Sequence, residues 1–266
     1  MEELTFDAVD DIALAWDRYG PSNTTDLPVS IGPLGPLIEL NSLALQHELS
    51  LQNISPFNTC KLLHRLHERH NGRPTLYTEG DESHGVLRLG VNADEDDLEF
   101  TEFGIGMQAA ARAAGIPVRA AQSLVGAIRE MRDNVLEHSG RRETALLVFR
   151  SSAPVFEFCI IDSGRGVLNS LRDNEEYSYL TDSGQALQVA IREGESRHGR
   201  TSGHGMGFRE LFRGLVTLRT NLRFRSGDHL LEMAEDSVTP ETPTIAQTAY
   251  LNGFFVSVQC RAPVSV

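Results

Sequence analysis

The sequence has 266 residues, of which 40% are hydrophobic and 23% charged, a balance typical of a folded protein with one large or two modest domains. Its formal net charge of -13 argues against general binding to nucleic acid or to anionic membranes, because both depend on surplus Lys and Arg. Three widely spaced cysteines indicate neither a disulfide framework nor a zinc site, and the opening MEELTFDAVDD has neither a signal peptide nor a membrane span, so we expect a cytoplasmic protein. A local basic patch would lie in the arginine-rich stretch from Arg192 to Arg225.

The first hundred residues predict a smaller α/β region. Residues 20–37 are rich in Gly, Pro, Ser and Thr and are typical of a loop, with a short strand at 28–31. Ser55 and Pro56 predict the start of a helix that ends at Asn71-Gly72, and a strand follows at 74–77. The acidic segment 92–100 is typical of a surface connector, so we place a domain boundary near residue 100, between a region 1–100 and a domain 101–266.

From Phe103 onward the expected elements follow one another regularly. A helix is predicted near 106–114 and a second over about 118–139, where Gly140 ends it. The second helix has an apolar stripe at helical spacing: Ala121, Leu124, Val125, Ile128, Met131 and Val135. Glu130, Asn134 and His138 recur at intervals of four on a neighbouring stripe, so they lie on one face of this helix.

The remaining elements complete an α+β pattern. Strands are predicted at 144–150 and 155–162, joined as a hairpin by Ser-Ser-Ala-Pro. A helix is expected to start near Gly205, a second hairpin to turn at Ser226-Gly227, and a last strand to cover 253–261.

Two glycine motifs carry chemistry. In DSGRG, residues 162–166 at the end of an apolar strand, the aspartate can accept a hydrogen bond from an exocyclic amine, and the glycines let the backbone approach a flat ring. In GHGMGF, residues 203–208, consecutive backbone N–H groups at a helix start suit a polyphosphate. The second motif is neither a Rossmann fingerprint nor a P-loop, because its spacing differs from the first and it lacks the Gly-Lys-Ser/Thr of the second.

In order, the chain has a helix with Glu130-x-x-x-Asn134, a strand ending in Asp162-x-Gly-x-Gly, a long loop, and Gly203-x-Gly-x-Gly. This combination resembles the GHKL family of DNA gyrase, the heat-shock chaperone ATPase, histidine kinases and MutL, and is closest in style to the ATPase domains of histidine kinases and anti-sigma-factor kinases. The resemblance covers about residues 103–261. It implies a two-layer α/β sandwich of the Bergerat type, preceded by the smaller N-terminal region, which faintly resembles STAS-like domains.

The resemblance also implies residue roles and cofactors, ATP and Mg²⁺. Glu130 would be the catalytic base, and Asn134 would be both a nucleotide contact and the magnesium ligand. Asp162 would bind the adenine amine, with Gly164 and Gly166 in the turn beneath the base. The phosphates would be held by Gly203, His204, Gly205, Met206 and Gly207. Residues 168–202 would form an ATP lid, in which Arg197, His198 and Arg200 are weaker candidates for phosphate contacts, as His204 is.

Each motif also has a purely structural interpretation. Glu and Asn four residues apart occur on many solvated helices, and His138 is better explained as a helix-end residue stabilised by the helix dipole than as a catalytic group. The histidines of HRLHERH, residues 64–70, fit a solvated helix face better than a metal site. One departure from the family is clear: Phe254 stands where many members have the Thr of a Gly-Thr pair.

Two functions from different classes stay open. The first is a regulatory Mg-ATP-binding enzyme, either a slow ATPase or a protein serine/threonine kinase of the anti-sigma type. The second is a nucleotide-gated interaction module without significant turnover. Both predict ATP and a protein regulator or phosphoacceptor as partners, and neither predicts nucleic acid or membrane. The oligomeric state is left open, a homodimer included.

Overall fold

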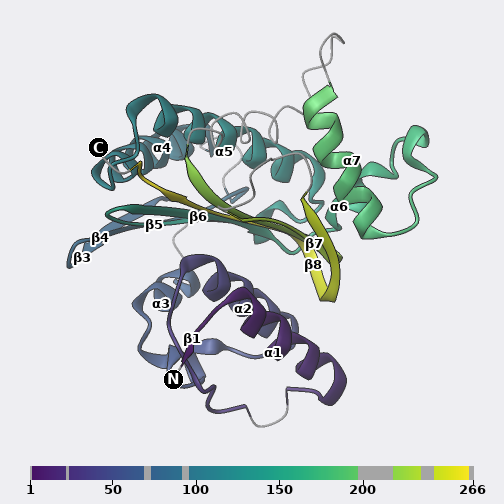
Figure 1. Ribbon diagram of the computed structural model, residues 1–266, viewed down its shortest axis with the longest axis horizontal. Coiled ribbons are helices and arrows are strands. Elements are labelled where there is room, and N and C mark those ends of the chain that lie inside the picture. The colour runs from purple at the N-terminus through teal and green to yellow at the C-terminus, as the bar shows by residue number, and fades with distance from the viewer. Residues whose placement is uncertain are drawn as a thin grey trace.

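The computed structural model describes residues 2–21, 24–68, 73–91, 96–196, 218–234 and 243–263. Its centre is a six-stranded antiparallel sheet with the strand order β3-β4-β5-β6-β8-β7 (Figure 1). The strands are β3 (Thr75–Glu79), β4 (Glu82–Arg88), β5 (Leu146–Ser152), β6 (Val155–Asp162), β7 (Arg219–Met233) and β8 (Thr244–Arg261). The architecture is therefore α+β, as the sequence predicts.

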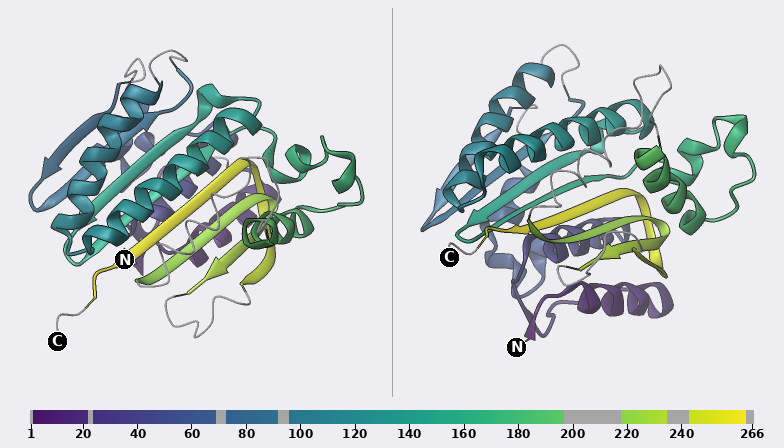
Figure 2. Two further views of the ribbon diagram at one scale, coloured as in Figure 1. Left: turned by 90° about the horizontal axis from the view of Figure 1, so that it is seen from above. Right: turned by 45° about the horizontal axis from the view of Figure 1, so that its top comes forward.

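Helices cover both faces of this sheet. One face carries α4 (Asp96–Ala113) and α5 (Val118–His138), which run over the sheet side by side, while α6 (Gly166–Leu171) and α7 (Ser183–Ser196) lie beside β7 and β8 (Figure 2). The other face carries the N-terminal elements α1 (Phe6–Tyr19), α2 (Leu34–Gln46) and α3 (Lys61–His67), with the short parallel strands β1 (Glu2–Glu3) and β2 (Val29–Ser30) (Figure 1). The described ranges also contain short 3₁₀ turns at Leu51–Asn53, Phe57–Thr59, Arg142–Thr144 and Glu175–Tyr177.

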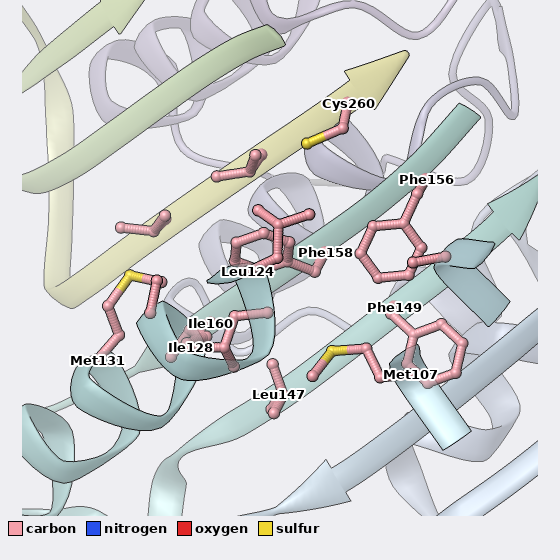
Figure 3. Packing of buried hydrophobic residues seen from close by; sticks show 14 of the residues in the cluster. Met107, Leu124, Ile128, Met131, Leu147, Phe149, Phe156, Phe158, Ile160 and Cys260 are labelled. Atoms are coloured by element: carbon pink, nitrogen blue, oxygen red, sulfur yellow. The ribbon is translucent and has the colours of Figure 1, made fainter. Parts of the chain in front are cut away.

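Side-chain alternation along the strands builds a separate core on each face. On β6, Phe158 and Ile160 pack beneath α4 and α5, whereas Cys159 and Ile161 pack against the N-terminal helices. Figure 3 shows Leu124, Ile128 and Met131 of α5 pointing at the strands that carry Phe158, Ile160 and Leu147. The amphipathic stripe predicted for 118–139 is thus confirmed, apart from Val125, which is only partly buried.

The N-terminal helices are joined to β7 by a buried ionic network. Arg223 donates from Nε to Glu39 Oε2 at 2.8 Å and from a terminal nitrogen to Asp10 Oδ1 at 2.7 Å. Arg225 also donates to Glu39, and Arg223 reaches the half-exposed Glu232. The side chains of Arg225 and Glu39 are 0% exposed and that of Arg223 2%. The prediction of a basic patch from Arg192 to Arg225 is therefore wrong for these two arginines, because acidic residues far away in the sequence neutralise them.

Several predicted elements differ from the observed ones. The helix expected from Ser55 begins only at Lys61, after a 3₁₀ turn at Phe57–Thr59. Helix α4 begins at Asp96 within the expected acidic connector, where Phe100 is fully buried. Ser226-Gly227 is not a hairpin turn, because β7 continues through it with a bulge and stays paired with β8. Strand β8 begins at Thr244, nine residues earlier than predicted.

The expected two layers become three, because residues 2–68 cover the second face of the sheet. These residues are mostly helical, with two strands of two residues each, and they lend the STAS-like resemblance no support. Strands β3 and β4 precede residue 100 yet belong to the central sheet, while the division into 1–100 and 101–266 stays a prediction. Within the described ranges, no helix has both the length and the apolar character needed to cross a membrane.

Candidate functional site

Asp162 is the last residue of β6 and lies under the end of α5. Because side chains alternate along the strand, Asp162 shares the face of Ile160, which packs toward α4 and α5. Its side chain is almost completely buried, with the residue 3% exposed. It accepts hydrogen bonds from Ser139 Oγ at 2.8 Å and from the backbone N–H of Gly164 at 2.7 Å, both on Oδ1. Among the described residues, Oδ2 has no hydrogen-bond donor.

Burial and hydrogen bonding act in opposite directions on the pKa of the Asp162 carboxyl group. Burial raises its pKa from the usual 3.8, and the hydrogen bonds from Ser139 and Gly164 oppose this by favouring the charged form. Oδ2 is not one of the described side-chain atoms that are both completely buried and unpaired, so it can be reached from solvent, and a ligand N–H group can donate to it. The site can therefore accept a hydrogen bond from an amine that reaches the end of β6.

The turn after Asp162 is clamped to the end of α5. The backbone N–H of Arg165 donates to Ser139 O at 2.9 Å, and Arg165 Nε donates to His138 O at 2.8 Å. A Cβ on Gly164 would overlap both the carbonyl oxygen and the hydroxyl of Ser139, so only glycine fits there. Gly164 is therefore required by the close approach of Ser139, the residue after α5, while its role beneath a bound base stays a prediction.

The turn after Asp162 also contacts β7 and β8. Ser226 Oγ accepts from the backbone N–H of Val167 at 3.0 Å and donates to Gly253 O at 2.8 Å. Gly253 has φ +79° and lies so close to Asp162 that a Cβ would overlap the Asp162 carbonyl oxygen. Gly166, also at positive φ, lies between these two supports. The turn is thus held by α5, β7 and β8 together.

Glu130 and Asn134 lie on the flank of α5 that faces away from α4. The guanidinium groups of Arg129 and Arg132 stack over Phe100 of α4, and Arg132 pairs with Asp97 of α4 at 2.8 Å. Met131 faces the core, and residues of an α-helix are about 100° apart. Arg132 is therefore on the α4 side of Met131, and Glu130 and Asn134 are on the opposite side.

These two side chains are free of protein partners within the described part of the chain: neither forms a hydrogen bond or an ion pair there. With a rise of about 1.5 Å per residue, Asn134 lies about 7.5 Å and Glu130 about 13.5 Å along the helix axis from Ser139, which touches Asp162. An elongated ligand with one end at Asp162 would run past Asn134 before it reached Glu130. His138 is an exposed helix-end residue, as its position predicts.

Part of the predicted site falls outside the described residues. This holds for Gly203, His204, Gly205, Met206 and Gly207, for Arg197, His198 and Arg200, and for the helix expected near Gly205. Of the expected lid, residues 168–196 are described and contain α7 and most of α6. Where described, the chain gathers no three His, Cys, Asp or Glu side chains in an arrangement that could hold a metal ion.

Sequence reasoning missed Ser139 and Ser226. Ser139 contacts Asp162, 23 residues away in the sequence, and Ser226 contacts Gly253 and Val167, which are 27 and 59 residues away, so no local pattern marks either serine. Phe254 was noted as a departure, and its ring packs edge to face against Phe224 with ring centroids 5.0 Å apart. A hydroxyl is therefore lacking at this position of β8, while Ser139, directly after α5, presents one to Asp162.

Comparison with known proteins gives no match, whether with protein-family models, with curated proteins or with solved structures.

Proposed function

We propose that this protein binds Mg-ATP at the end of β6 and along α5, in the manner of GHKL proteins, and acts as a regulatory ATPase or protein serine/threonine kinase. On this proposal the α+β sheet with α4 and α5 is a Bergerat-type ATP-binding fold. The observation that carries the proposal is Asp162, a buried carboxylate whose Oδ1 is saturated and whose Oδ2 lacks a donor among the described residues.

The adenine end of the nucleotide fits this carboxylate chemically. The 6-amino group of adenine is a hydrogen-bond donor, and a carboxylate is an acceptor only. The close packing of Gly164 on Ser139 and of Gly253 on the Asp162 backbone holds the turn that carries the carboxylate, so the acceptor is fixed at the end of β6. Gly166 continues the same turn.

The α5 flank fits the phosphate end. The side-chain oxygen of Asn134 is a hard ligand suited to Mg²⁺, which keeps several waters and is usually shared between one or two protein oxygens and phosphates. That mode of binding needs no cluster of acidic residues, and no such cluster is present among the residues that the structure describes. On this proposal the glycine run 203–207 contributes backbone N–H groups to the phosphates.

Glu130 would determine whether the bound nucleotide reacts. In phosphoryl transfer a carboxylate can orient the attacking hydroxyl or water and accept its proton, and Mg-ATP would supply the phosphoryl group. Glu130 lies about one helical turn beyond Asn134 on the same flank and has no partner in the described chain. The second candidate function, a nucleotide-gated interaction module, rests on the same binding site and needs no turnover.

Binding is tested by Asp162→Asn. Loss of a hydrogen bond to a charged group costs about 1.5–3 kcal/mol, so the affinity for ATP should fall at least about tenfold in equilibrium binding. The matched control is Asp11→Asn, the same chemical change at an exposed residue of α1, which should bind as the wild type does. Equal ATP affinity of Asp162→Asn and wild type would refute the family assignment.

Turnover is tested by Glu130→Ala, with Glu137→Ala on the same helix as the control. The enzyme proposal expects Glu130→Ala to keep its ATP affinity and to lose phosphate release or transfer to a partner, whereas Glu137→Ala keeps both. A wild type that binds ATP but shows neither reaction with any partner supports the interaction module instead.

A further inference from the structure

Ser139 ends α5 and directs its hydroxyl group at the candidate base-binding carboxylate. The residue is 5% exposed, and its Oγ accepts from the backbone N–H of Arg141 at 3.3 Å while donating to Asp162 Oδ1 at 2.8 Å. Its carbonyl oxygen is held by the backbone N–H of Arg165. Because the N–H of Arg141 already points at Oγ, the hydroxyl proton is the part of this group left to donate to Asp162.

This contact controls how the carboxylate is turned. The terminal torsion of an aspartate is broad, so an unrestrained carboxylate has no preferred oxygen to offer a ligand. Here Ser139 and Gly164 both donate to Oδ1, which pins that oxygen against the end of α5 and the turn. Oδ2 is left as the acceptor that a ligand can use.

The hydroxyl group that binds Asp162 comes from Ser139 and not from the strand β8 that pairs with Asp162. Strand β8 pairs Phe254 with Asp162, and the Phe254 ring packs on Phe224 rather than offering a polar group. The residue before it, Gly253, backs directly onto the Asp162 carbonyl. Ser139, the residue that follows α5, is thus the side chain that supplies a hydroxyl proton to Asp162.

We propose that Ser139 is a positioning residue that makes the site select a 6-aminopurine over a 6-oxopurine nucleotide. This inference rests on the proposed function. Adenine presents an N–H donor to Oδ2, whereas hypoxanthine presents a carbonyl oxygen, which meets a carboxylate oxygen without a proton between them. A carboxylate released by loss of Ser139 can rotate or take up a proton, and a protonated carboxyl can donate to the 6-oxo group.

The experiment compares binding of ATP and inosine triphosphate, two nucleotides with the same sugar and phosphates that differ at this one edge of the base. The full chain is used as wild type, Ser139→Ala and a control, Ser163→Ala, whose residue lies in the same turn and contributes a backbone N–H to Thr144. The wild type and the control should prefer ATP equally. Ser139→Ala should reduce the ratio of the two affinities about tenfold, because ATP binding weakens more than binding of inosine triphosphate.

A second variant keeps the test decisive if Ser139→Ala folds poorly. Asp162→Asn should prefer inosine triphosphate, because Ser139 and Gly164 still hold Oδ1 and so turn the amide Nδ2, a donor, toward the 6-oxo group. Adding Ser139→Ala to this variant should weaken that preference.

The possible outcomes separate the two proposals. An unchanged ratio in folded Ser139→Ala, an equal loss of affinity for both nucleotides, or no inversion in Asp162→Asn overturns the role of Ser139, while the proposal that the wild type binds ATP stands. If the wild type binds neither nucleotide, the proposed function itself fails.

Discussion

The buried Glu39 should be one of the most sensitive positions for stability. Its carboxylate accepts hydrogen bonds from both Arg223 and Arg225, and all three side chains are at most 2% exposed. Glu39→Gln keeps the shape and one acceptor oxygen but removes the negative charge between two buried guanidinium groups. The remaining anions, Asp10 and Glu232, are both partly exposed, and both contact Arg223.

The size of the expected loss in unfolding free energy depends on the partners that the two arginines keep in Glu39→Gln. Removing one partner of a buried ion pair typically costs 3–5 kcal/mol, because the other charge stays buried. Since Arg223 keeps Asp10 and Glu232, and Arg225 keeps its bond to the backbone oxygen of Ala249, we expect the lower end, about 3 kcal/mol. The direction of the Arg223 pKa agrees: Glu39 and Asp10 raise it, against the effect of burial.

The assay is the free energy of unfolding from urea titration of the whole chain, compared with Glu79→Gln. Glu79 makes the same kind of pair with Lys61 at 2.6 Å, but this pair lies at the surface, where solvent screens the charges, so that variant should lose much less stability than Glu39→Gln. If Glu39→Gln lost no more than Glu79→Gln, the ionic network would not be what fastens the N-terminal helices to β7.

Three further predictions concern the candidate site. Gly164→Ala should lower the free energy of unfolding by more than about 2 kcal/mol, measured by urea titration, because the new Cβ overlaps the Ser139 backbone; an unchanged value would mean that the turn relaxes freely. ATP affinity should fall as the pH drops through the Asp162 pKa, which burial raises above 3.8, since only the charged form accepts the amine; Asp162→Asn should lose this dependence in binding titrations. Asn134→Ala should raise the Mg²⁺ concentration needed for tight ATP binding, and an unchanged requirement would remove Asn134 as a ligand.

The elements that the sequence predicts well are those determined by local periodicity. Helix α5 has its buried residues at helical spacing and ends beside Gly140, and β5 and β6 alternate around a tight turn, so each could be read from neighbouring residues alone. The DSGRG turn could be predicted for the same reason: its glycines and its aspartate lie next to one another. The sequence alone could not predict which residues pack against those glycines.

The misjudged elements depend on contacts distant in sequence. The first turns of α4 are acidic and look like a connector, but Asp97 and Phe100 bind the arginines of α5 about thirty residues later. Ser226-Gly227 has the local signal of a hairpin turn, yet pairing with β8 on both sides turns it into a bulge within one strand. Local propensity was overruled in each case by a partner that the surrounding residues do not reveal.

Strand β7 explains why the N-terminal helices and the candidate site form one structural unit. Arg225 points to the N-terminal side and joins Glu39, while Ser226, the next residue, points to the opposite face and supports the turn that follows Asp162. Adjacent residues on a strand cannot move independently, so a shift of β7 that relieved Arg225 would also displace Ser226 from Val167 and Gly253. The bulge at Gly227 lies immediately beyond this pair, so the regular register between β7 and β8 is interrupted only after both contacts have been made. The geometry of the Asp162 turn therefore depends on charges buried on the far side of the sheet.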